Sequence, residues 1–137
     1  MTKERRLAVS LLLLRLGIFI VMLIWTIDKF VRPDHAASVF SNFYGISGLD
    51  AQIAYVLGAL ELALLLAFVA GIARRWSYGI VLVLHGVSTF STWSQYLHPF
   101  EGPNLLFFTA WPMLAACAAL YLLRDWDAYT IGGSRPN

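Results

Sequence analysis

The chain has 137 residues, of which 59% are hydrophobic and only 13% are charged, with a formal net charge of +2. A soluble globular domain carries about 25% charged residues, and a disordered chain combines low hydrophobicity with high net charge, so both classes are excluded. The basic residues mostly flank apolar runs, so we do not expect a nucleic acid as partner. The composition predicts one integral membrane domain over residues 1–137.

Apolar runs follow one another along the chain, and each is long enough for a membrane span, which needs about 20 residues. We expect spans at about residues 7–29, 50–72, 76–97 and 104–123. The first run exceeds the roughly 7–15 residues of a signal-peptide core and lacks a small-residue cleavage site, so it is expected to remain as a span. The predicted fold class is therefore all-α, a polytopic up-down bundle of four transmembrane helices.

The segments between the runs contain prolines, which stop helices because proline lacks an amide donor and restricts the preceding residue. Such breaks lie at residues 32–34 and 98–104. In the first loop, residues 38–44 are predicted to form a short interfacial helix that ends at Gly45. The pair Trp111-Pro112 predicts a kink in the last span, and Gly17 and Gly58 predict close helix approach.

The distribution of charged and aromatic residues predicts the orientation. Basic residues gather on one side, at Lys3, Arg5, Arg6, Arg74, Arg75, Arg124 and Arg135, against Lys29 and Arg32 on the other. The positive-inside rule then places both termini in the cytoplasm. Two aromatic belts are expected, Trp76, Tyr78, Tyr121 and Trp126 on the cytoplasmic side and Trp25, Phe30, Phe43, Tyr44, Trp93, Tyr96 and Phe100 on the other.

Three ionisable residues, Arg15, Glu61 and His85, fall inside the predicted spans. A charge at the bilayer centre costs about 2.5–3.5 kcal/mol, so each needs a partner or a function. Counted from the cytoplasmic span ends at 1.5 Å per residue, all three lie roughly 12–16 Å deep. This predicts a buried Arg15–Glu61 ion pair with His85 nearby, which either holds three helices together or handles protons or a ligand headgroup, for which a quinone is the candidate.

The third span carries a polar stripe, because Ser88, Thr89, Thr92 and Gln95 recur at helical spacing. Hydroxyl groups in membrane helices commonly bond to the carbonyl group four residues earlier, which favours a packing face. A polar-lined cavity is the alternative interpretation.

At the outer end of the first span, Asp28 and Lys29 lie among charges predicted to line the outer membrane surface. We interpret them as a solvated face, on which Lys29 and Arg32 pair with Asp28 and Asp34. No metal site is predicted, because the histidines and carboxylates lack a recognisable ligand spacing. The single cysteine, Cys117, rules out an internal disulfide.

The order and spacing of several short motifs resemble those of the DoxX/DoxD-like family of small four-span membrane proteins, over nearly the whole chain. The motifs are Arg15-Leu16-Gly17, Asp28-Lys29-Phe30 with Pro33, the stretch 57–62 around Glu61, and Gly71 followed by Arg74-Arg75. In the family, polar residues tend to be kept where Arg15, Lys29 and Glu61 stand, and an aspartate often follows the last span, as Asp127 does here. Residues 123–127 depart from the family's frequent glycine-proline-glycine lead into that aspartate.

This resemblance implies a membrane subunit in a bacterial inner membrane that supports a quinone-linked or other redox partner rather than catalysing alone. It implies a protein partner or a homo-oligomer, no built-in cofactor, and quinone as the candidate ligand. At most the chain would be the membrane subunit of a quinone-linked oxidoreductase, and no catalytic residue is assigned. The alternative is a small-molecule or lipid carrier, or a membrane scaffold or assembly factor, that acts as a homo-oligomer. Inverted repeats or broken helices would favour transport, and the sequence shows neither.

Overall fold

The computed structural model describes residues 1–131, and every regular element within that range is helical. In chain order the elements are α1 (Lys3–Val31), α2 (Pro33–Tyr44), α3 (Ala51–Ala70), α4 (Arg74–Ser91), α5 (Trp93–Leu97), α6 (Asn104–Phe107), α7 (Ala110–Leu122) and the 3₁₀ helix η1 (Arg124–Trp126). The predicted all-α class is confirmed. Arg135, counted above among the cytoplasmic basic residues, lies outside the described range.

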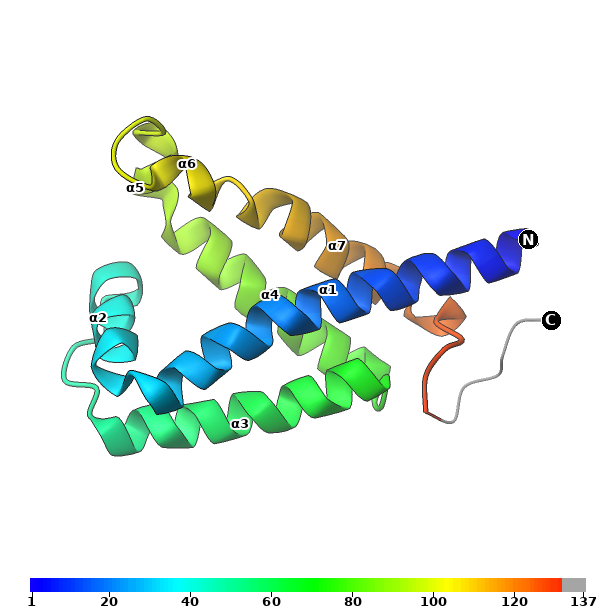
Figure 1. Ribbon diagram of the computed structural model, residues 1–137, viewed down its shortest axis with the longest axis horizontal. Helices are drawn as coiled ribbons and strands as arrows, with labels where there is room; N and C mark the ends of the chain where they lie inside the picture. Colours follow the sequence, from blue (N-terminus) through cyan, green and yellow to red (C-terminus); the bar gives the residue numbers. More distant parts are fainter. Residues whose placement is uncertain (132–137) are drawn as a thin grey trace.

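The long helices α1, α3, α4 and α7 extend between two distinct ends, with α4 and α7 inclined to α1 and α3 (Figure 1). The start of α1 and the turn between α3 and α4, residues 71–73, lie at what we call the turn end. The helices α2, α5 and α6 lie at the opposite end, which we call the α2 end. Helix α1 packs against α3 and α7, and α4 packs against the same two helices.

The helix ends follow from local sequence. The Asp50 carboxylate accepts a hydrogen bond from the Ile53 amide at 2.8 Å and so caps the start of α3. Gly71 ends α3 in the left-handed conformation, with a φ of 72°. Helix α2 ends at Gly45 in the same way, as predicted, but it begins earlier, at Pro33, because proline suits the first turn of a helix.

The core lies where the four long helices meet. It contains Leu11, Ile18, Met22, Leu65, Phe68, Tyr78, Val81, Cys117 and Leu120. The prediction that Tyr78 belongs to an interfacial aromatic belt is wrong, because its ring is buried against Phe68 at a centroid distance of 5.2 Å. Burial of a tyrosine requires a partner for its hydroxyl group, and that partner lies inside the protein.

Gly58 in α3 lies at a close contact between helices, whereas Gly17 in α1 does not. A Cβ atom at Gly58 would lie 2.8 Å from the Phe30 ring, so α1 and α3 approach closely there, as predicted. Gly17 has no such neighbour within 4 Å, so the predicted close approach at that position is wrong. Near Pro112 the regular helix is interrupted, since α6 ends at Phe107 and α7 begins at Ala110.

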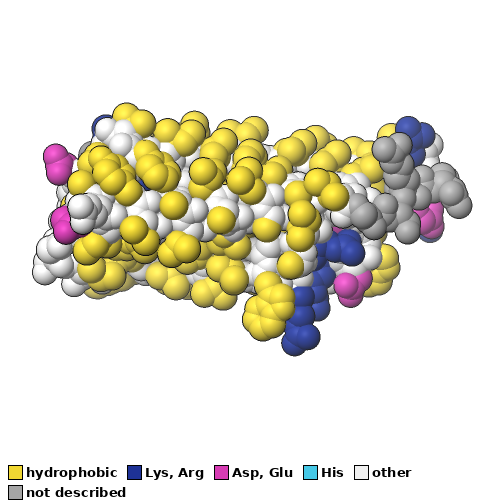
Figure 2. All heavy atoms as spheres, turned by 90° about the horizontal axis from the view of Figure 1, so that it is seen from below, with side chains coloured by type: hydrophobic (Ala, Val, Ile, Leu, Met, Phe, Trp, Pro, Cys, Tyr) yellow, Lys and Arg dark blue, Asp and Glu magenta, His cyan; other side chains and the backbone are white. Residues whose placement is uncertain are grey.

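Three helical segments are long and apolar enough to cross a membrane: Lys3–Val31, Ala51–Ala70 and Asn104–Leu122. They correspond to the first, second and fourth predicted spans and are consistent with an integral membrane location. The third predicted span is divided into α4 and α5, and α4, with 18 residues, is not among the three. Apolar side chains cover most of the face seen in Figure 2, and lysine and arginine side chains gather toward one end.

Candidate functional site

Arg15 lies in α1 and is almost completely buried, with 2% of its surface exposed. Its Nη1 atom lies 2.5 Å from Oδ2 of Asp127 and donates to the Tyr78 hydroxyl oxygen at 3.0 Å. The Tyr78 hydroxyl in turn donates to the same Asp127 oxygen at 2.6 Å. These three side chains, from α1, α4 and the chain after η1, form what we call the buried arginine site.

The chain after η1 folds back onto the turn end and brings Asp127 to Arg15. Arg74 Nη1 donates to the Asp127 carbonyl oxygen at 2.8 Å, and the Ile131 amide donates to the Ala70 carbonyl oxygen at 2.9 Å. Arg15 Nη2 also donates to the Tyr129 carbonyl oxygen. We call residues 127–131 the C-terminal segment, and its contacts close the turn end of the bundle.

The predicted Arg15–Glu61 pair is wrong, because α1 and α3 are offset along their axes. The Arg15 guanidinium lies level with Gly71, 3.4 Å from where a Cβ atom of that residue would stand. Glu61 stands ten residues earlier in α3, which at 1.5 Å per residue is about 15 Å away along the helix. The prediction counted depth from the ends of the apolar runs, as though those ends were level.

Glu61 instead pairs with Lys29, whose Nζ atom lies 2.9 Å from Oε2 of Glu61. The two side chains are 12% and 19% exposed, so the pair lies at the edge of the α1–α3 contact rather than in the core. The missing side chain at Gly58 lets the end of α1 approach α3 at this level. The prediction that Lys29 pairs with an aspartate on the outer surface is therefore wrong.

Asp28 is the neighbour of Lys29 and has two other partners. One of its oxygens lies 2.6 Å from Arg32 Nη2, which confirms the predicted pairing of Arg32 with Asp28. The other lies 2.5 Å from Nδ1 of His35, the residue whose ring stacks on Trp25. We call Asp28, Lys29, His35 and Glu61 the α2-end ionic cluster.

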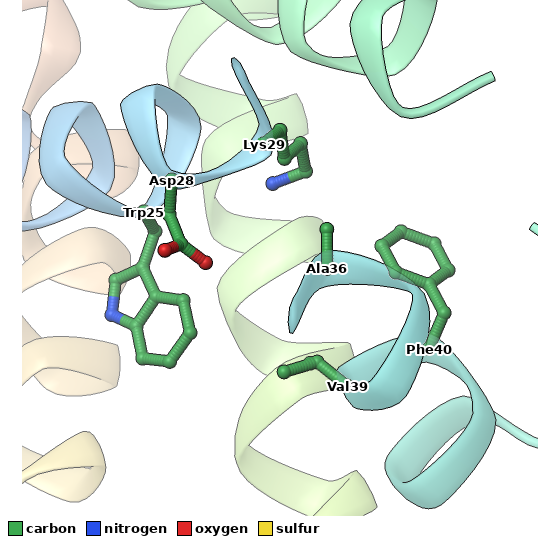
Figure 3. Close-up of a pocket in the computed structure, with 6 residues that line it drawn as sticks. All are labelled: Trp25, Asp28, Lys29, Ala36, Val39 and Phe40. Carbon is green, nitrogen blue, oxygen red and sulfur yellow. The ribbon is translucent and has the colours of Figure 1, made fainter. Parts of the chain in front are cut away.

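A small pocket opens between α1 and α2 beside this cluster. Trp25, Asp28 and Lys29 line it from α1, and Ala36, Val39 and Phe40 line it from α2 (Figure 3). Two charged groups therefore stand next to an apolar and aromatic wall. The space between these side chains measures about 210 Å³, smaller than the roughly 300–1,000 Å³ of a typical ligand pocket, so a flat headgroup could enter only if α2 moved away from α1.

His85 joins neither Arg15 nor Glu61. Its Nε2 atom lies 3.0 Å from the carbonyl oxygen of Ala110, where α7 begins. Because a carbonyl oxygen can only accept, Nε2 carries the proton in this contact. The three ionisable residues predicted to share one layer thus have three separate sets of partners.

The polar stripe of α4 mostly bonds within its own helix. Thr89 donates to the His85 carbonyl oxygen at 2.7 Å, the bond to the carbonyl group four residues earlier that was expected. Thr92 lies just beyond α4, where its hydroxyl is 3.1 Å from the Thr89 carbonyl oxygen and 2.9 Å from the Tyr96 hydroxyl. Ser88 differs, since its hydroxyl lies 2.7 Å from the Tyr44 hydroxyl of α2. Gln95 lies in α5 and accepts from Ser94 at 2.9 Å.

Sequence reasoning missed Tyr78 and the Tyr129 carbonyl group as partners of Arg15, and it reached Asp127 only through the family resemblance. A signal was present, because Asp127 follows the last apolar run closely and so returns to the turn end. Over residues 1–131, no group of three or more histidine, cysteine or acidic side chains is placed to hold a metal ion.

Comparisons of the chain with models of known protein families, with characterised proteins and with solved structures found no match. The resemblance to the DoxX/DoxD-like family therefore stays a prediction that rests on its short motifs.

Proposed function

We propose that this chain is a four-span, DoxX-like subunit of a quinone-linked redox complex in a bacterial inner membrane, with both termini in the cytoplasm. Support for the location comes from the three apolar helical segments and from the basic residues at the turn end. Support for α4 as the remaining span comes from its position between α3 and α7 and from its exposed apolar side chains, which include Ile80, Val83, Val87 and Phe90. Such a surface suits lipid.

The observation that carries the redox proposal is the α2-end ionic cluster beside the aromatic-lined pocket. A quinone headgroup is flat and apolar, with carbonyl oxygens that accept hydrogen bonds. With α2 moved away from α1, Lys29 would donate to one carbonyl oxygen, while Trp25 and Phe40 would contact the ring. The isoprenoid tail would lie along exposed apolar side chains of α1 and α3, such as Ile24 and Tyr55.

Reduction of a quinone to a quinol consumes two electrons and two protons, and each carbonyl oxygen becomes a hydroxyl group. In this proposal a partner dehydrogenase supplies both electrons, because a cofactor normally carries such chemistry. The protons come from water through His35, whose side chain is 38% exposed and contacts Asp28. The quinol then leaves into the bilayer.

The test is equilibrium binding of a short-chain quinone to the full chain in detergent. We expect saturable binding to the original chain. In the double variant Lys29→Gln/Glu61→Gln, which leaves neither charge unpaired, we expect about tenfold weaker binding, the effect of losing one charge-assisted hydrogen bond. The matched control is Lys3→Gln, an exposed lysine at the turn end, which should bind normally. Equal binding by the double variant, or no saturable binding at all, would remove the quinone site from the proposal.

A further inference from the structure

The buried arginine site is divided between the helical bundle and the C-terminal segment. Arg15 and Tyr78 belong to the long helices α1 and α4, and both are at most 2% exposed. Asp127 lies beyond η1, where the backbone is extended, and its side chain fills the space next to them. The bundle thus contributes the cation and a hydroxyl group, and the segment contributes the carboxylate.

The Asp127 carboxylate does not satisfy every hydrogen-bonding group of this site. Arg15 and Tyr78 both contact the same carboxylate oxygen, Oδ2. Within the described part of the chain, Asp127 Oδ1 and Arg15 Nε are buried without a hydrogen-bond partner. A guanidinium group and a carboxylate bind best through two parallel hydrogen bonds, and leaving buried polar atoms unpaired is unfavourable. The covalent connection to the segment therefore limits how well this carboxylate can fit.

The segment also has contacts that do not involve the Asp127 side chain. Arg74 bonds to the Asp127 carbonyl oxygen, and the Ile131 amide bonds to the Ala70 carbonyl oxygen. These contacts should persist when the carboxyl group is removed by substitution. The Asp127→Ala chain would then keep a recess beside Arg15 and Tyr78 with the volume of one carboxylate.

We propose that Arg15 and Tyr78 form a carboxylate-binding site of the bundle, which Asp127 occupies within the same chain and which accepts a small free carboxylate when that side chain is absent. The occupant within the chain is present at a high effective concentration, in the millimolar range for short connections. It therefore excludes small carboxylates from the original protein. A free carboxylate is not restrained by the chain and can pair with Arg15 through two oxygens.

The experiment uses the full chain in detergent and formate as probe, because formate matches the group that Asp127→Ala removes. We expect this variant to unfold at a lower temperature than the original chain and formate to raise its midpoint saturably by several degrees. Sodium chloride at equal ionic strength and formamide, the neutral analogue, should have no such effect. Asp125→Ala, a change at an exposed neighbour, should respond to none of them. The double variant Arg15→Gln/Asp127→Ala should lose the response to formate.

An Asp127→Ala chain that is folded and does not respond to formate would overturn the proposal, as would an equal response to chloride. If that variant does not survive extraction, Asp127→Asn provides the test, because asparagine has the shape of aspartate without its charge. The asparagine variant should unfold well below the original midpoint, because Arg15 would keep a buried charge without a carboxylate partner. Equal midpoints would overturn the proposal.

Discussion

Lys29 and Glu61 join the last turn of α1 to the middle of α3, with Nζ 2.9 Å from Oε2. Phe30 lies against Gly58 on the same face of α3, so the ion pair is one of several contacts that α1 and α3 make at this displacement along each other. The same displacement brings Arg15 level with Gly71 and away from Glu61. The same relative position of the two helices therefore accompanies both the Lys29–Glu61 pair near the α2 end and the Arg15–Asp127 pair at the turn end.

Glu61→Gln should destabilise the protein, because Lys29 would keep its charge without a partner. Removal of one partner of a buried pair costs about 3–5 kcal/mol, and we expect the lower end of that range because both side chains are partly exposed. Adding Lys29→Met should restore most of the stability, whereas adding Arg15→Met should not. Thermal unfolding in detergent measures all three variants. Rescue by Arg15→Met instead would indicate that Arg15 and Glu61 pair after all.

Gly58→Leu should separate α1 from α3. A Cβ atom at this position already lies 2.8 Å from the Phe30 ring, so a larger side chain overpacks the contact, which typically costs about 1–3 kcal/mol. The matched control is Gly17→Leu, where no neighbour lies within 4 Å. That variant should unfold at the original midpoint or above it, because leucine is a better helix former than glycine. Similar midpoints for the two variants would contradict the close approach at Gly58.

Gly71→Ala should lower the stability of the protein by more than the cost of a left-handed backbone conformation alone. The φ angles of Gly71 and Gly48 are 72° and 80°, and a left-handed residue costs about 1–2 kcal/mol when it is not glycine. A Cβ atom at Gly71 would also collide with Thr130, whereas Gly48 has open space around it. Gly48→Ala therefore measures the backbone cost, and the excess for Gly71→Ala measures the packing of the C-terminal segment. Adding Thr130→Gly should remove that excess, and a persistent excess would show that another contact causes it.

Single cysteines should report the arrangement of the spans once Cys117 is replaced by alanine. We expect an impermeant maleimide to label cysteines at Thr2 and Asp125 from the cytoplasmic side. Cysteines at Gly48 and Glu101 should be labelled from the opposite side. Intact spheroplasts and inverted vesicles give the two accessibilities. Labelling of the Glu101 and Asp125 positions from the same side would mean that the segment between them does not cross the membrane.

The helical class and several local features follow from the sequence, because they depend on interactions between residues that are close in the chain. The apolar runs predicted α1, α3 and the segment from α6 to α7, and Gly45 predicted the end of α2. Thr89 bonds to the carbonyl group four residues earlier, as its position in an apolar helix led us to expect. The close approach at Gly58 was predicted on the same local grounds.

The partners of the charged residues were decided by tertiary structure. Counting residues located Arg15 and Glu61 within their own helices, but the offset between α1 and α3 depends on packing along the whole contact, and no local pattern encodes it. The path of the chain after α7 decided that Asp127 reaches Arg15, and it buried Tyr78, whose position had suggested a membrane interface. Sequence by itself determined which residues need a partner, because burial of a charge is costly wherever it occurs. Only the fold, through the relative positions of its helices, determined which partner each residue has.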